Sequence, residues 1–472
     1  MSLDPLHRWE QRFGSLPLPS PLVWAALAAA FLGFGVLMGR ATGSGALAEG
    51  RAPLKLLVAH APAASTTPPV AKPPPLPEAE TTPEPSSAPT SSSKEAKRAG
   101  GGGAASHSSE PSGGSKESSG GGGSSVPPST KAKLPPIKHV FVVMLSQEPY
   151  ATAFGPASPA HYLSGQLEKR GQLLVRYYGV AHEALANEIA LLSGQGPTEA
   201  TAANCPTYTA VEPASTGADA QVLGKGCLYP SSTGTLMGQL SSRHFTWKAY
   251  VEGIDEGTAQ PAACAHPALG AGEPAAGSYR AWRNPFVYFQ AIAGSPACAT
   301  HDVGMNGLGH DLADEARTAD FTYIVPGPCD DGSPTPCAPG AASGMTAADA
   351  FLHRNVPLIL NSKAYKKNGL LAVTVDEAPS SGEYADSSSC CGQPRFPNLP
   401  APTGAAALSP QGGGQVGLLL LSPFIKKAGL AQDTYNHFSL LATIEQAFGL
   451  PRLGYAGLSE VKPFSPSLFS GG

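Results

Sequence analysis

Apolar positions are unevenly distributed, and the first concentration of them lies near the N-terminus. Residues 22–39 form an uncharged run of eighteen residues that ends before Arg40. At about 1.5 Å per residue, a helix of this length nearly matches a hydrocarbon core of about 30 Å. The run therefore predicts one transmembrane helix after a short cytoplasmic tail, residues 1–21. A cleaved signal peptide is the alternative, with Ala46-Leu47-Ala48 as its cleavage site.

Residues 40–136 show neither helical nor strand periodicity. From about residue 61 this segment consists mainly of Pro, Ser, Thr, Gly and Ala with scattered charges. Such a composition buries too little apolar surface to offset its chain entropy, so we expect a disordered linker. Taken as a coil, residues 61–136 span a root-mean-square distance of roughly 50 Å, which is enough to hold a domain away from a membrane.

From residue 137 onward, buried β-branched runs alternate with helical patterns. The first run, IKHVFVVML at 137–145, is apolar at most positions, which is typical of a strand buried on both faces. Strands that alternate with helices predict an α/β fold in residues 137–472, a mostly parallel sheet covered by helices on both faces. We expect the other strands at 173–180, 245–251, 321–327, 370–375 and 416–425. We expect the helices at 161–171, 183–194, 233–243, 346–362 and 435–450.

Composition narrows the class of protein. The formal net charge is −4, only 14% of residues are charged, and no basic run is interleaved with aromatic residues. These features argue against a nucleic-acid-binding protein. All eight cysteines lie between Cys205 and Cys391. An even number confined to one domain predicts disulfides in an oxidising compartment, with reduced buried thiols as the alternative. Because Cys390 and Cys391 are adjacent, we expect each to pair elsewhere.

The orientation of the predicted membrane helix follows from the cysteines more than from its flanking charges. Arg8 and Arg12 precede the helix, whereas Arg40, Arg51 and Lys55 follow it. This slight bias does not favour an exported C-terminus, but long domains cross a membrane largely regardless of such charges. We therefore expect a single-pass cell-membrane protein with an extracytoplasmic C-terminal domain.

Chemically active side chains follow the predicted strands. In an open α/β sheet, functional groups collect at the carboxyl ends of the strands. The candidate groups at or near such ends are Ser146, Gln147, His182, Asp376, Glu377 and His437.

Five ordered segments resemble the bacterial phosphoesterase family, which includes acid phosphatases and phospholipases C and belongs to the alkaline-phosphatase-like superfamily. The resemblance covers nearly all of residues 137–465 and implies an alkaline-phosphatase-like α/β/α sandwich with a divalent metal ion as cofactor. The segments are IKHVFVVML leading to YATAFG, YYGVAHEALANEIALLSGQGPT, PGPCDD, LLAVTVDEA, and the stretch from VGLLLLSPFI to LGYAG.

The resemblance assigns metal ligands, and some of these positions are altered. Asp376, Glu377 and His437 match positions that bind metal or phosphate in the family. The first strand of the family usually ends in Glu-Asn, whereas this chain has Ser146 and Gln147. Neither residue can be anionic, so a metal ion here is weakened or lost. A structural interpretation is also open, because an acidic pair after a buried strand can cap a helix and His437 follows Asn436 near a helix N-terminus.

The nucleophile position is also altered. The family pattern resembles His-x-Ser-Leu-x-Asn, and this chain retains His182, Leu185 and Asn187 but has Ala184 in place of the nucleophile. Glu183 is a poor replacement, because adjacent side chains on a helix point about 100° apart.

Other acidic positions are interpreted as structural. The family often carries a His-Asp pair where this chain has Asp330 and Asp331, which we expect to form an Asx turn. The pairs His301-Asp302 and His310-Asp311 lack a third nearby ligand, so we expect solvated side chains there.

Two functions remain open from the sequence. The first is a membrane-anchored, extracytoplasmic phosphoesterase that uses a metal ion on Asp376, Glu377 and His437. The second is a pseudoenzyme that binds a phosphorylated, glycan or protein ligand at the cell surface. Ala184, Ser146 and Gln147 favour impaired catalysis, because all three stand where the chemistry is most demanding.

Overall fold

The computed structural model describes residues 133–255, 263–273, 278–334, 336–401, 403 and 411–470. The predicted cytoplasmic tail, the predicted membrane helix at 22–39 and nearly all of the predicted linker lie outside these residues. Among the residues that are described, no helix is both long enough and apolar enough to cross a membrane.

A mostly parallel sheet of eight strands forms the centre of the fold. β1 (His139–Leu145) is buried along its whole length, as its β-branched run predicts. It pairs in parallel with β9 (Gly369–Val375) on one side and with β8 (Phe321–Val325) on the other. The strand order is β11-β2-β10-β9-β1-β8-β6-β7.

The sheet departs from parallel pairing at one strand. β10 (Leu418–Leu421) runs antiparallel to both of its neighbours, β9 and β2 (Gln172–Leu174). The remaining strands of the sheet are β6 (Trp247–Val251), β7 (Asp302–Val303) and β11 (Gly429–Ala431). Two smaller sheets pair β3 (Tyr177–Tyr178) with β12 (Tyr435–Asn436) and β4 (Glu212–Thr216) with β5 (Val222–Lys225).

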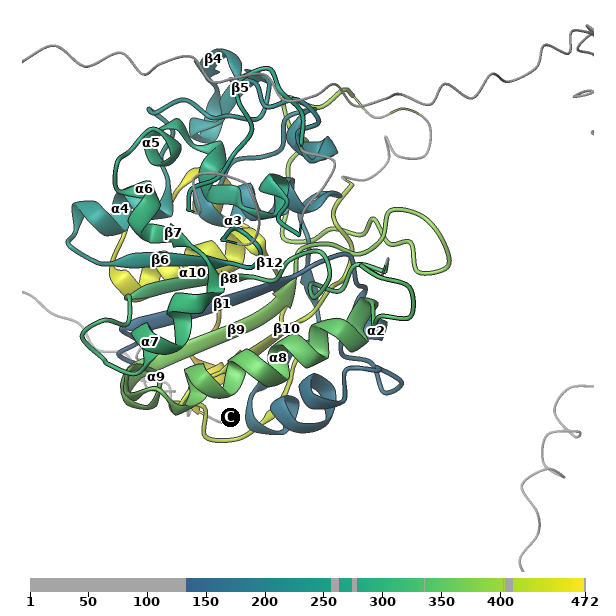
Figure 1. The fold of residues 1–472 in the computed structure, drawn as a ribbon, viewed down its shortest axis with the longest axis vertical. Helices are drawn as coiled ribbons and strands as arrows, with labels where there is room; N and C mark the ends of the chain where they lie inside the picture. Colours follow the sequence, from purple (N-terminus) through teal and green to yellow (C-terminus); the bar gives the residue numbers. More distant parts are fainter. Residues whose placement is uncertain are drawn as a thin grey trace, which may run out of the picture. The chain divides into compact units, whose positions relative to one another are not determined.

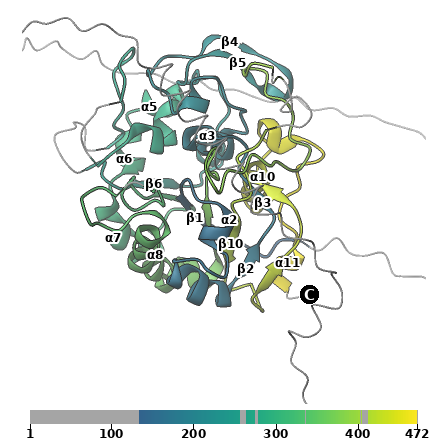
Figure 2. The same ribbon diagram turned by 90° about the vertical axis from the view of Figure 1, so that its right-hand side faces the viewer.

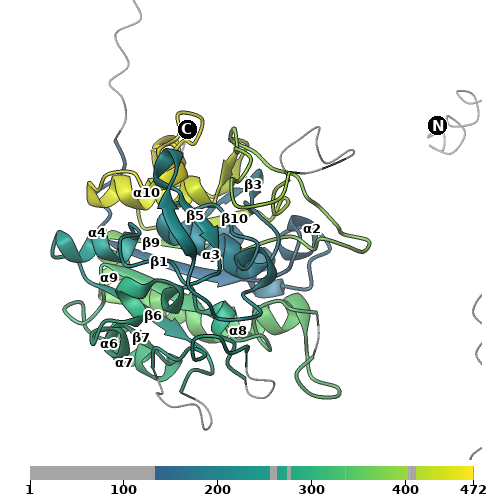
Figure 3. The same cartoon turned by 90° about the horizontal axis from the view of Figure 1, so that it is seen from above.

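Helices cover both faces of the large sheet. α8 (Gly344–Asn361) lies on one face, and α3 (Ala184–Ser193) with α10 (His437–Phe448) lies on the other (Figures 1 and 2). Figure 3 shows the same separation of α8 from α10 from above. The α/β prediction is therefore confirmed. The other helices are α2 (Tyr150–Ala153), α4 (Leu236–Ser242), α5 (Gln290–Ala293), α6 (Cys298–His301), α7 (Leu308–Leu312), α9 (Lys363–Asn368) and α11 (Ser467–Ser470).

The ends of α10 show why this helix forms where it does. The side chain of Asn436 accepts a hydrogen bond from the Ser439 N–H (3.1 Å), which caps the first turn. Gly449 ends the helix in the left-handed conformation (φ 64°), which glycine adopts without steric cost. Ten of its residues are buried, so α10 is a core helix that fixes His437 inside the domain.

All eight cysteines form disulfides, as their confinement to one domain predicts. The pairs are Cys205–Cys227, Cys264–Cys298, Cys329–Cys337 and Cys390–Cys391. The prediction that Cys390 and Cys391 pair elsewhere was wrong. Each of the other six cysteines has its partner within 34 residues along the chain, which leaves the adjacent two to each other.

Candidate active site

The carboxyl ends of β1 and β9 bring Ser146, Gln147 and Asp376 together. The register pairs Leu145 with Val375, so the residues that follow each strand are neighbours. The hydroxyl of Ser146 donates to Asp376 Oδ2 (2.8 Å), and the Gln147 N–H donates to Oδ1 (3.1 Å). Both oxygens of this fully buried carboxylate are thus bound by the segment at which the family places its Glu-Asn pair.

A buried arginine lies against the same carboxylate. Arg283 ends the 3-10 helix η6 (Ala281–Arg283), and its side chain is only 1% exposed. Nη1 lies 2.7 Å from Asp376 Oδ2 and 2.7 Å from Glu188 Oε1, and Nη2 donates to the carbonyl of Met144 (3.0 Å). Nε forms an ion-pair contact with Asp331 Oδ2 (3.2 Å) that is not aligned as a hydrogen bond. One guanidinium therefore faces three buried carboxyl groups.

Burial shifts the carboxyl groups of this arginine cluster (Arg283, Glu188, Asp331 and Asp376) toward the neutral form. Burial raises the pKa of Glu188 to about 8 and that of Asp376 to about 6, and it also raises the pKa of Asp331. Arg283 opposes these shifts, but one positive charge cannot balance three negative ones. At neutral pH Glu188 is therefore largely protonated, while the guanidinium stays charged.

Three members of the cluster are absent from the predicted site. Glu188 is a fully buried carboxyl and the only charged residue of α3, and that position in a mainly apolar helix could have indicated it in the sequence. Arg283 lies in a short irregular segment, and no pattern in the sequence around it indicates that it is buried. Asp331 does form the expected Asx turn, since its Oδ1 accepts from the Ser333 N–H (2.7 Å), but its other oxygen faces Arg283.

The predicted ligand His437 lies fully buried at the start of α10. Its Nε2 lies 2.7 Å from the backbone carbonyl of Asp376, and its Nδ1 lies 2.9 Å from the hydroxyl of Tyr177. Burial lowers the pKa of His437 to about 4, so the ring is neutral at physiological pH. Because both ring nitrogens have partners inside the protein, this histidine links α10, β9 and β3.

The position of the family nucleophile is occupied by a fully buried methyl group. Ala184 is the first residue of α3, and Glu183 caps the helix with a positive φ of 72°. Asn187 fixes the preceding segment, since its Oδ1 accepts from the N–H groups of Val180 (2.8 Å) and Ala181 (3.2 Å). The retained Asn187 therefore has a structural role that needs no substrate.

The other retained residues of this region form a second polar group. Glu377 is buried and accepts a hydrogen bond from the Glu183 N–H. Its Oε2 lies 3.7 Å from Nδ1 of His182, whose Nε2 lies 2.8 Å from the hydroxyl of Ser387. Burial, together with the nearby charges of Asp376 and Glu183, raises the pKa of Glu377 well above its ordinary value.

These residues do not fit a divalent metal ion. A metal site needs carboxylate or imidazole atoms that converge and face an open position. Asp376 instead binds Ser146, Gln147 and Arg283, and both nitrogens of His437 are engaged. Among the described residues, Asp376, Glu377 and His437 do not form a group whose ligand atoms lie within 4.8 Å of one another.

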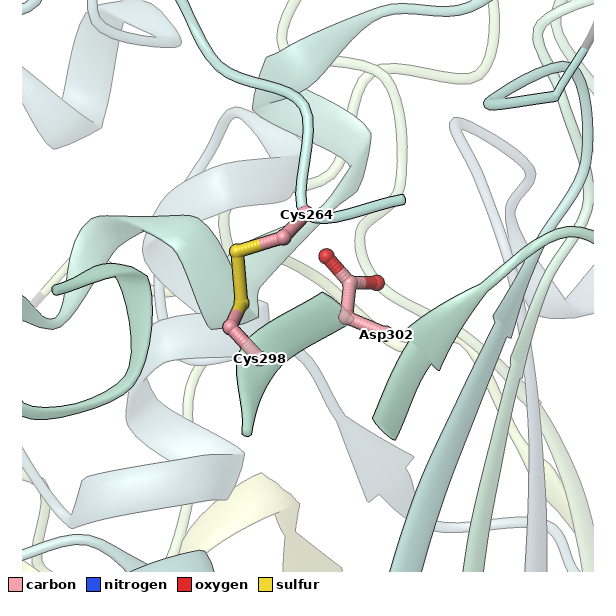
Figure 4. A group of neighbouring side chains, drawn as sticks. All are labelled: Cys264, Cys298 and Asp302. Carbon is pink, nitrogen blue, oxygen red and sulfur yellow. A yellow bond between two sulfur atoms is a disulfide. The ribbon is translucent and has the colours of Figure 1, made fainter. Parts of the chain in front are cut away.

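One group of metal-ligating types does converge elsewhere in the described part of the chain. Cys264, Cys298 and Asp302 offer atoms within 4.8 Å of one another, but Figure 4 shows that the two sulfurs are bonded to each other. As a disulfide they offer no thiolate to a metal. Asp302 is fully buried and accepts from Asn284 Nδ2 (2.8 Å), so the expectation of a solvated side chain was wrong here.

The same correction applies to Asp311. It is 9% exposed, and its Oδ2 accepts hydrogen bonds from Lys248 Nζ and from the hydroxyl of Tyr250, both at 2.6 Å. These two hydrogen bonds hold α7 against β6, because Asp311 belongs to the helix and both donors belong to the strand.

The fold and the site together define a class of protein. A mostly parallel sheet carries a cluster of buried acidic groups where the carboxyl ends of its central strands meet, which is where open α/β sheets place their functional sites. The chain belongs to the Phosphoesterase family, because the sequence model of that family matches residues 157–451. No curated protein matches the chain.

The solved structures to which the chain is similar have low sequence identity and TM-scores below 0.5. An alkaline phosphatase superfamily protein from Vibrio parahaemolyticus is 11% identical, with a TM-score of 0.41 over 72% of this chain and 73% of that one. The phosphonate monoester hydrolase SpPMH from Silicibacter pomeroyi is 10% identical, with a TM-score of 0.36 over 71% and 77%. The lipoteichoic acid synthase LtaP from Listeria monocytogenes is 10% identical, with a TM-score of 0.37 over 69% and 76%.

Proposed function

We propose that this chain is a membrane-anchored Phosphoesterase-family protein that has lost metal-dependent hydrolysis of phosphate esters and retains the fold for binding. The observation that carries the proposal is Arg283. Its guanidinium supplies a fixed positive charge to Asp376, the residue that the family resemblance assigns to a metal ion.

A guanidinium cannot replace a metal ion in catalysis. A bound divalent ion lowers the pKa of water from about 15.7 toward 7 and offers an open position to substrate oxygens. Arg283 instead uses its donors on Glu188, Asp376 and the Met144 carbonyl, and it is 1% exposed. The charge is therefore satisfied internally and does not reach a substrate.

The nucleophile position supports the same conclusion. Attack on phosphorus needs an oxygen held in line, and Ala184 supplies a buried methyl group instead. Groups that act together in catalysis are strongly non-additive, so Ala184→Ser alone is not expected to create activity.

A cavity beside the arginine cluster favours a binding role. It has a volume of about 580 Å³ and opens where β1 and β8 end. Gln147, Arg280, Trp282 and Ser333 are among its lining residues. An aromatic ring, a guanidinium and short polar groups suit a phosphorylated or glycan ligand, because they combine stacking with charge-assisted hydrogen bonds.

The proposed anchoring rests on the uncharged run at 22–39, and the proposed extracytoplasmic location is supported by the four disulfides of the domain. The ligand would then be a phosphate ester or another cell-surface molecule within reach of the linker.

Metal binding tests the proposal directly. The full-length protein is dialysed against Zn²⁺ or Mn²⁺, freed of loosely bound ions, and its metal content is measured beside an Asp376→Asn variant. We expect no stoichiometric metal in either protein. One tightly bound ion per chain that disappears in Asp376→Asn would refute the proposed loss.

A further inference from the structure

Ser387, His182 and Glu377 lie in a row in space next to the arginine cluster. Ser387 Oγ lies 2.8 Å from Nε2 of His182, and Nδ1 of the same ring lies 3.7 Å from Oε2 of Glu377. Ser387 and His182 are both partly exposed, the His182 side chain by 22%, whereas the Glu377 side chain is only 5% exposed. The serine can therefore meet a solute, while the glutamate stays behind the ring.

The loop that carries Ser387 is fixed on both sides. Asp386 accepts hydrogen bonds from the N–H groups of Ser388 and Gln415, both at 2.8 Å. The carbonyl of Ser387 accepts from the Gly412 N–H (3.0 Å). A nucleophile needs a backbone that holds its oxygen in one place, and these bonds provide one.

The segment that carries His182 is fixed as well. The two residues before it donate their N–H groups to Asn187, and Gln393 Nε2 donates to the carbonyl of Val180 (2.8 Å). The imidazole can therefore meet the Ser387 hydroxyl and the Glu377 carboxyl at the same time. Nδ1 has no hydrogen-bond partner within bonding distance, although it is buried. Separations of this kind in a free enzyme commonly shorten when substrate binds.

We propose that Ser387, His182 and Glu377 form a metal-independent nucleophilic site that hydrolyses carboxylic esters. Ser387 Oγ attacks the acyl carbon while its proton passes to Nε2 of His182. The alcohol leaves with that proton, and Ser387 holds the acyl group as an ester. Water then attacks this ester with His182 again accepting the proton, which returns to Ser387 as the acid departs. The net reaction consumes one water and releases one acid and one alcohol.

Glu377 is a positioning residue in this scheme. It does not touch the ester but lies behind the imidazole, with Oε2 3.7 Å from Nδ1. Because its pKa is raised, Glu377 acts by orienting the ring and not as a negative counter-charge. Ser387 is thus the nucleophile, His182 the base and Glu377 the acidic residue behind the base. Catalytic groups of this kind occur on unrelated folds and are recognised by their geometry.

An apolar cavity beside the loop indicates the class of acyl group. It has a volume of about 330 Å³ and is lined mainly by apolar residues that include Phe396 and Leu399, with Arg395 and Gln411 as its polar members. Gln411 precedes Gly412, which donates its N–H to Ser387. An ester with a short apolar acyl chain therefore matches this surface better than a charged one.

A fluorophosphonate probe tests the site on the full-length protein. Its phosphorus bonds to an activated serine oxygen, fluoride leaves, and the serine proton passes to the base. We expect one covalent adduct, mapped by mass spectrometry to Ser387, in buffer that contains a metal chelator. Ser387→Ala should abolish labelling, and His182→Gln should slow it by about 100-fold or more. Ser388→Ala is the matched control, because that exposed neighbour should label like the unmodified protein.

The same substitutions should affect hydrolysis of 4-nitrophenyl butyrate in the same way: Ser387→Ala should abolish it, His182→Gln should slow it, and Ser388→Ala should leave it unchanged. Glu377→Ala should lower kcat with little change in KM, and Glu377→Gln, which keeps the shape of the neutral acid, should restore most of the loss. An adduct mapped to another serine, no adduct in the unmodified protein, or equal labelling of Ser387→Ala would overturn the proposal. Because the assay excludes divalent ions, its failure says nothing about the metal-dependent reaction considered above.

Discussion

At the scale of single residues, Arg283 is the group on which the other buried charges depend. It is the partner of Glu188, Asp331 and Asp376, and all four side chains are almost fully buried. Removing one member of a buried ion cluster is costly because the remaining charges stay desolvated. The cluster therefore makes the stability of the domain sensitive to both substitution and pH.

The substitution Arg283→Met should lower the free energy of unfolding by about 3–5 kcal/mol, since three carboxyl groups lose their cation. Urea unfolding followed by tryptophan fluorescence measures this loss. Arg317→Gln is the control, because its ion pair with Asp314 is exposed and contributes only about 0–1 kcal/mol. Equal effects of the two substitutions would contradict the role given to Arg283.

Stability should also fall as the pH rises from 6.5 to 8. The pKa of Glu188 is raised from 4.5 to about 8 in the folded protein, so across this interval the folded state still holds a proton that the unfolded state has already lost. His437 acts in the opposite direction, since its pKa is lowered from 6.5 to about 4, but this effect fades within about one pH unit above 6.5.

Urea unfolding at several pH values measures this slope, and Glu188→Gln should reduce it because the amide imitates the protonated acid. Other buried carboxyl groups, such as Asp302 with a pKa raised to about 7, account for the remainder. The exposed Glu199 provides the control substitution Glu199→Gln. A slope that Glu188→Gln leaves intact would show that Glu188 is ionised in the folded state.

Part of this site could be predicted from the sequence. The strand pattern predicted that Ser146, Gln147 and Asp376 follow the carboxyl ends of strands, and the parallel register of β1 and β9 makes them neighbours. Arg283 was missed because it lies 93 residues before Asp376 in an irregular segment without periodicity. Ser387 was missed for the same reason, since its partner His182 is 205 residues away.

At the scale of elements, long apolar runs were predictable and short irregular ones were not. β1, β9 and α10 form where the pattern places them, since each is buried and regular over seven residues or more. The run 173–180 was expected to be one strand but forms β2 and β3, which belong to different sheets. The helix expected at 161–171 contains a π-turn at Leu163–Leu167 and a 3-10 turn at Glu168–Arg170.

Disulfides tie several irregular segments to the core, and their contributions should differ with loop length. Replacing Cys264 and Cys298 by alanine opens a loop of 34 residues and should cost about 2–5 kcal/mol of unfolding free energy. Replacing Cys390 and Cys391 is the matched control, since adjacent cysteines close almost no loop and should cost much less. Thermal or urea unfolding of the two double variants decides this, and a reversed order would contradict the prediction.

At the scale of the whole molecule, the sequence predicts a domain tethered to a membrane. Full-length protein should sediment with membranes and resist extraction by high salt, because an apolar helix at 22–39 would span the bilayer. External protease should release a fragment that begins within residues 61–136. Soluble protein whose N-terminus is Glu49 would show cleavage after Ala48 and remove the anchor.

We propose that this chain keeps the Phosphoesterase-family fold but has lost metal-dependent hydrolysis of phosphate esters. The most direct test is hydrolysis of 4-nitrophenyl phosphate and of bis(4-nitrophenyl) phosphate by the full-length protein with and without Zn²⁺, Mn²⁺ or Mg²⁺. We predict rates equal to those of an Asp376→Asn/Glu377→Gln variant, with no dependence on the added ion. Metal-dependent turnover that disappears in that double variant would contradict the account.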